Sequence, residues 1–172
     1  MITARLATRY LRLAILAGLL TGCGFQPRGQ AQLPPELAVV SVQSQQAIGA
    51  PPGALSRRLP LLLASNGVTV TRDPAQATAT ITILSEGGGR RAVAADRFDI
   101  KRQYWLAYSA SYQVTLANGK ILIAPESLSA NRTLLFDETR VLGFEAAQES
   151  LAGSMADELA WQIIRRLQAL KS

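Results

Sequence analysis

The sequence predicts an α+β fold, a two-layer sandwich in which two helices pack on one face of a mostly antiparallel, four-stranded sheet. Leucines recur at helical spacing early in the chain, apolar residues alternate with polar ones through its middle, and the last part is one long amphipathic stretch. Such helices and such a sheet bury their apolar sides only against each other. The 172 residues suffice for one domain of this kind, which we place at residues 37–172.

Residues 1–22 have the features of an export signal, with basic residues followed by an apolar run shorter than the about 20 residues that span a bilayer. The run closes on Leu20-Thr21-Gly22-Cys23, which matches the bacterial lipobox. We therefore predict that Cys23 is the first residue of the mature protein, with a diacylglycerol on its sulfur and an acyl chain on its amine. The alternative is a buried cysteine behind an ordinary leader. Gly24, where inner-membrane retention would call for aspartate, favours the outer membrane by analogy with other bacterial lipoproteins.

The tether and the first elements follow the leader. Residues 23–36 are rich in Gly, Pro and Gln and indicate a lipidated tether. A strand is expected at 37–43. A helix is expected next, because leucines repeat at helical spacing before the C-capping pair Asn66-Gly67. Pro60 within it predicts a kink or a late start.

The middle of the chain alternates as strands do. Strands are expected at 68–73 and 77–86, and the glycines and basic residues after them indicate a long hairpin arm. From 104 to 116 one face carries Tyr104, Tyr108 and Tyr112 and the other carries Trp105. Asn118-Gly119 predicts a hairpin turn into a strand at 121–136, in which Pro125 marks a bulge or an edge.

The C-terminal segment predicts a helix through residues that step by four along one side, with small and apolar residues beside them. The stepping residues are Leu151, Met155, Leu159, Ile163 and Leu167.

Composition excludes several classes of function. The chain has no histidine and one cysteine, so zinc sites, imidazole chemistry and a disulfide scaffold are not expected. The glycines at 87–89 lack the phosphate-loop pattern. Acidic residues at turns are read as solvated side chains rather than as a catalytic pair: Asp96, Asp99, Asp137 and Glu138. We predict no enzyme, no cofactor and no metal. Export also removes nucleic acid as a partner, although the formal charge is +6.

Basic residues gather at the arm and suggest a binding surface for an anionic amphiphile, because guanidinium groups bind phosphate bidentately. Lys120 and Arg132 are expected near them across the sheet. The alternative is a solvated hairpin tip. Tyr104 and Trp105 are candidates for contact with a partner protein, where such residues are enriched, although an aromatic stripe is more often core. The basic cluster consists of Arg90, Arg91, Arg97, Lys101 and Arg102.

Several segments in order resemble the LptE (RlpB) family of LPS-assembly lipoproteins. They are the lipobox running into "CGFQPRG", "GAPPGALSRRLPLLLASNGVTV", "YWLAYSASYQVTLANGK", "NRTLLFDE" and "MADELAWQIIRRL". The resemblance covers nearly the whole chain. It implies a fold of two helices on a four-stranded sheet and no enzymatic activity.

The resemblance also implies partners. Family members form a plug in the lumen of the outer-membrane β-barrel LptD, assist its assembly and help deliver lipopolysaccharide to the cell surface. The family's lipopolysaccharide-contacting arginine corresponds to Arg97, seven residues before Tyr104. A second basic position of the family falls near Glu145 here, with Arg140 the nearby cation. The second candidate function is a periplasm-facing lipoprotein of another envelope assembly or ligand-binding system.

Overall fold

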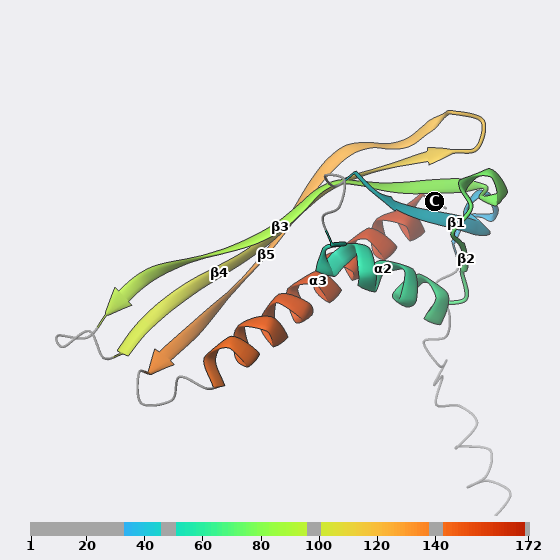
Figure 1. Cartoon of the computed structure of the whole chain (residues 1–172). Coiled ribbons are helices and arrows are strands. Elements are labelled where there is room, and N and C mark those ends of the chain that lie inside the picture. The colour runs from blue at the N-terminus through green and yellow to red at the C-terminus, as the bar shows by residue number, and fades with distance from the viewer. Residues whose placement is uncertain (1–32, 46–50, 96–100, 138–142, 171–172) are drawn as a thin grey trace, which may run out of the picture.

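A computed structural model describes residues 33–45, 51–95, 101–137 and 143–170, of which residues 95, 101 and 137 are described for the backbone alone. A five-stranded sheet in the order β2-β1-β3-β4-β5 carries two helices, α2 and α3, on one face (Figure 1). The elements are η1 (Pro35–Leu37), β1 (Val39–Ser44), α2 (Ala54–Ser65), β2 (Thr69–Thr71), η2 (Pro74–Gln76), β3 (Ala79–Ala95), β4 (Lys101–Leu116), β5 (Ile121–Asp137) and α3 (Phe144–Ala169).

The predicted two-layer α+β arrangement is confirmed, but the count of four mostly antiparallel strands is wrong. The sheet is mixed, because β1 pairs in parallel with both β2 and β3. The reason is the connection between them: β1, α2 and β2 form a strand-helix-strand unit, and a helix that crosses over returns the chain in the same direction. The antiparallel part is the meander β3-β4-β5.

Local signals place the turns correctly. Gly67 has a φ of +84° directly after the cap of α2, and Gly119 has a φ of +83° in the turn between β4 and β5. Both are left-handed conformations that glycine adopts without a steric penalty. Asn-Gly pairs were therefore reliable markers at both positions.

The two prolines inside elements have different consequences. Pro60 lies within α2, which begins at Ala54, so the late start is wrong; the missing N–H leaves the carbonyl of Ser56 without its helical partner. Pro125 lies in a bulge, because Ala124 and Pro125 both face Gln113 where the register shifts. Since β5 is also an edge strand, both readings of Pro125 are confirmed.

The core lies between the helices and the sheet. The predicted stripe of β4 points into it, and Tyr112 and Val114 are fully buried against apolar residues of α3 such as Ile163. The other face of β4, which carries Trp105, is covered by none of the described helices (Figure 1). We call it the open face.

Strands β3, β4 and β5 run on beyond α2 as a long three-stranded extension, with the N-terminal turns of α3 beside it (Figure 1). We call the part of the extension from Gly87 to Ala95, with its partners on β4 and β5, the arm.

Candidate functional site

Two consecutive arginines of β3 lie on opposite faces of the arm. Arg90 is paired in register with Leu106 on the helix-covered face, and Arg91 is paired with Trp105 on the open face. Successive side chains of a strand alternate between its faces, so neighbours in sequence serve different surfaces. The predicted basic cluster is therefore divided between two surfaces.

On the helix-covered face, Arg90 lies against an aromatic cluster. Its guanidinium carbon is 5.6 Å from the ring centroid of Tyr104 and 5.5 Å from that of Phe144. These distances are within the range of cation–π attraction. Phe136 completes the cluster, with its ring centroid 4.7 Å from that of Phe144 and 6.2 Å from that of Tyr104. The cluster therefore joins β4, β5 and the first turn of α3 around one cation.

Arg90 is exposed and only partly engaged. Its Nη1 donates to Oε1 of Gln148 on α3 at 2.6 Å. Gln148 is neutral, and the ion pairs between described residues do not include Arg90. A guanidinium carries five N–H donors, so Arg90 keeps the capacity to bind an anion.

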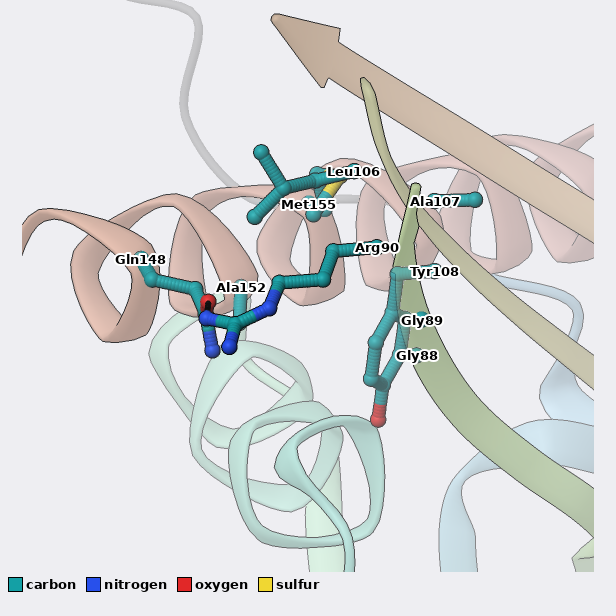
Figure 2. A pocket seen from close by; sticks show the side chains of 9 residues that line it. All are labelled: Gly88, Gly89, Arg90, Leu106, Ala107, Tyr108, Gln148, Ala152 and Met155. Atoms are coloured by element: carbon teal, nitrogen blue, oxygen red, sulfur yellow. Dashed lines mark hydrogen bonds between the residues drawn. The ribbon is translucent and has the colours of Figure 1, made fainter. Parts of the chain in front are cut away.

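A cavity of about 400 Å³ lies beside Arg90, between β3–β4 and α3. Figure 2 shows Arg90 stretched toward Gln148, with Leu106 and Met155 nearby and the ring of Tyr108 on β4. Its walls are predominantly apolar. The lining residues are Gly88, Gly89, Arg90, Leu106, Ala107, Tyr108, Gln148, Ala152 and Met155.

The hydroxyl of Tyr108 is committed to another partner. It donates to Glu86 Oε2 at 2.5 Å and accepts from the backbone N–H of Leu55 at 3.2 Å. Burial, with a smaller contribution from the hydrogen bond to Glu86, raises the pKa of Tyr108 to about 12. Tyr108 therefore stays neutral, and it contributes an uncharged aromatic ring to the cavity wall.

Next to Trp105, the open face of the arm carries one charged side chain, Arg91, with small side chains farther along β4. Arg91 lies over the indole, 4.8 Å from its ring centroid. The next positions on the same face are Ala107 and Ser109 of β4, which pair with Gly89 and Gly87 of β3. A face of this kind offers one aromatic anchor on an otherwise smooth surface.

The remaining basic candidates fall in different places. Arg102 is partly buried and paired with Phe136, so alternation puts it on the face of Tyr104. Lys101 begins β4, and its side chain lies outside the described residues, as do Arg97, Arg140 and Cys23. Glu145 is exposed in the first turn of α3.

Of the two basic residues expected near the cluster, one is close and one is remote. Arg132 is paired with Leu106, which is paired in turn with Arg90, and its Nη2 contacts Glu158 of α3 at 2.6 Å. Lys120 follows the turn at the opposite end of β4, so the expectation that it lies near the basic cluster is wrong. A hairpin's two ends lie far apart when its strands are this long.

Sequence reasoning missed Phe136, Phe144 and the cavity. Phe136 belongs to the same alternating set as Arg132 and Leu134, which could have pointed to it. Phe144 begins a helix whose packing against the arm depends on tertiary structure. Tyr104 and Trp105, both considered for partner contact, point to opposite faces and do not share one contact surface.

Within the described residues no cluster of His, Cys, Asp or Glu has the arrangement of a metal site. The acidic residues considered above lie outside the described side chains. None of the described helices is long and apolar enough to cross a membrane.

Comparison with known proteins gives one family. Residues 36–167 match the family model of LptE, described as lipopolysaccharide-assembly. The LPS-assembly lipoprotein LptE of Yersinia enterocolitica is 29% identical over 164 residues, which cover 95% of this chain and 75% of that protein. The LptE of Yersinia pestis strain Pestoides F is equally similar, at 29% over the same length.

Solved structures share the fold. Lipoprotein B of Nitrosomonas europaea has a TM-score of 0.67 at 21% identity, covering 86% of this chain and 92% of that one. The rare lipoprotein B of Shewanella oneidensis has a TM-score of 0.61 at 17% identity, covering 77% and 96%. At these identities the likeness supports the fold alone.

Proposed function

Because this chain belongs to the LptE family of lipopolysaccharide-assembly lipoproteins, we propose that it forms a plug in the outer-membrane β-barrel LptD, assists the barrel's assembly and helps deliver lipopolysaccharide to the cell surface. The match of the family model over residues 36–167 is the observation that carries the proposal. The family is one of assembly lipoproteins, not a known family of enzymes.

The open face supports a role in protein contact. The described helices cover one side of the sheet, which leaves the other side for a partner, and Trp105 is the kind of residue that anchors such interfaces. Small neighbours such as Ala107 and Ser109 let a partner approach closely. We assign the barrel contact to this face, with Trp105 at its centre. Tyr104 belongs to the other surface of the arm.

The basic residues support contact with lipopolysaccharide, a phosphorylated amphiphile. Arg90 combines unused donors with an apolar surrounding, and Arg102 lies on the same face. Arg97 and Lys101 remain part of the proposed site, whereas Arg91 lies on the open face and would contact lipopolysaccharide only from that side of the sheet.

Membrane attachment is proposed through acylation of Cys23. Two or more acyl chains hold a protein stably at a membrane where one chain binds only marginally. The domain would then face the periplasm from the outer membrane. Mass spectrometry of the mature N-terminus tests this assignment, and an unmodified thiol at Cys23 contradicts it.

The second candidate, a lipoprotein that binds a ligand in another envelope system, is favoured by the cavity beside Arg90. It shares the fold and the anchor and differs in the partner.

Co-purification separates the two candidates. The full-length lipoprotein, tagged at its C-terminus, is extracted from outer membranes in mild detergent and its partners are identified by mass spectrometry. We expect a large β-barrel in one-to-one ratio. Recovery of the lipoprotein without any barrel refutes the plug and leaves the second candidate.

A further inference from the structure

The cavity beside Arg90 combines apolar walls with one cation. We infer that this cavity binds one alkyl chain of an anionic amphiphile, with the headgroup on Arg90. The inference rests on the proposed function only for the source of the amphiphile, which would be lipopolysaccharide. Its chemistry, an alkyl chain carrying a phosphate or carboxylate, is read from the cavity itself.

The cavity is large enough for an alkyl chain. The space is partly open to solvent, so a ligand can enter it. A space of about 400 Å³ with apolar walls lies within the range of small-molecule sites. Leu106, Met155 and Ala152 offer hydrocarbon surface to whatever enters.

Small residues keep the cavity open. A Cβ at Gly88 would lie 3.2 Å from the ring of Tyr108 and 3.2 Å from the carbonyl oxygen of Ala107, so a larger residue there would crowd the wall of the cavity. Ala152 lines the cavity from α3, where a larger side chain would occupy the space. The sheet and the helix are therefore separated by a gap that the side chains between them do not fill.

The polar groups of the lining define the kind of headgroup. Tyr108 directs its hydroxyl to Glu86, so it offers the cavity only its ring. Arg90 is the charged side chain of the lining, and it is exposed, held by two aromatic rings and bonded to a neutral amide. One positive charge at one side of an apolar space suits a chain with a single anionic end.

The test uses the full-length lipoprotein in outer-membrane extracts and a dodecyl phosphate carrying a diazirine at the end of its chain. Photolysis and mass spectrometry then identify the labelled peptide. We expect label on the α3 peptide that contains Ala152 and Met155. Label confined to other peptides, or spread evenly over the chain, overturns the inference.

Two variants test the cavity. Ala152→Phe places a ring in the space and should lower labelling of the α3 peptide about tenfold, as loss of a chain's burial does. Ser150→Phe, at an exposed position of the same helix, is the matched control and should keep wild-type labelling. Ala152→Leu fills the space with a smaller side chain and should also lower labelling of the α3 peptide. It replaces Ala152→Phe if the phenyl ring disturbs folding. Equal labelling in wild type and both Ala152 variants overturns the inference.

A third variant tests the headgroup contact. Arg90→Gln should raise the half-labelling concentration of dodecyl phosphate about tenfold, the loss expected for one charge-assisted hydrogen bond. A diazirine-tagged dodecanol should be unaffected by this variant. If the phosphate and the alcohol respond alike, Arg90 does not bind the headgroup and the inference fails.

Competition identifies the source of the ligand. Lipopolysaccharide that lowers labelling of the α3 peptide supports it as the natural occupant, whereas dodecanoate that competes better supports a free fatty acid; either supports an anionic alkyl chain. Ala152→Phe should still co-purify with the barrel, so loss of labelling and loss of the barrel are separate failures. A barrel complex without labelling refutes the cavity site alone.

Discussion

Glu86 holds the start of α2 against the sheet, and its replacement by alanine should destabilise the domain. The helix begins after Gly53, which offers no side chain to cap it. Glu86 of β3 takes that role, because its carboxylate accepts from the backbone N–H groups of Leu55, at 2.9 Å, and Ser56, at 3.3 Å. It also accepts from the hydroxyls of Ser56 and Tyr108.

The expected loss follows from these contacts. Removing a helix N-cap costs about 0.5–2 kcal/mol. Leaving the Tyr108 hydroxyl without its acceptor adds about 1–2 kcal/mol, since the side chain is only 6% exposed. We expect Glu86→Ala to lower the free energy of unfolding by about 1.5–4 kcal/mol.

Urea denaturation followed by circular dichroism measures this loss. Glu149→Ala, at an exposed position of α3, is the control and should stay within about 0.5 kcal/mol of wild type. A Glu86→Ala variant as stable as the control would show that the carboxylate does not cap α2.

Two further predictions concern alkaline stability and partner contact. Burial raises the pKa of both Tyr108 and Tyr112 to about 12, above the ordinary value of 10, so the stability that they contribute is present below pH 10 and is lost as the pH rises through about 12. Urea midpoints should fall over that window in wild type and less in Tyr108→Phe; parallel curves contradict the assignment. Trp105→Ala should reduce recovery of the barrel about tenfold or more. Trp161→Ala removes the other tryptophan, which is 39% exposed on α3, and should leave recovery of the barrel unchanged. Equal recovery from the two variants refutes the open face as the contact.

Much of the fold could be predicted because its signals are local. The alternation in β4 decides which side chains enter the core, and it correctly separated Tyr112 from Trp105. The Asn-Gly pairs ending at Gly67 and Gly119 marked turns that need a left-handed residue. The resemblance to the LptE family, based on segments in order, is confirmed by the family match.

The candidate site could be predicted only in part. Arg90, Arg91 and Trp105 were singled out from the sequence, but their division between two faces follows from the register of β3 against β4. A bulge between Ile83 and Ser85 sets that register. A shift of β3 by one residue would move each of its side chains to the opposite face of the sheet.

The sequence by itself determined the elements, the face of β4 that enters the core and the family, because each depends on neighbours along the chain. Only the tertiary structure decided the parallel pairing of β1, the cap that Glu86 supplies to α2 and the cavity between the arm and α3. Each of these joins residues far apart in the chain, and Glu86 and Leu55, 31 positions apart, meet only once the helix packs on the sheet.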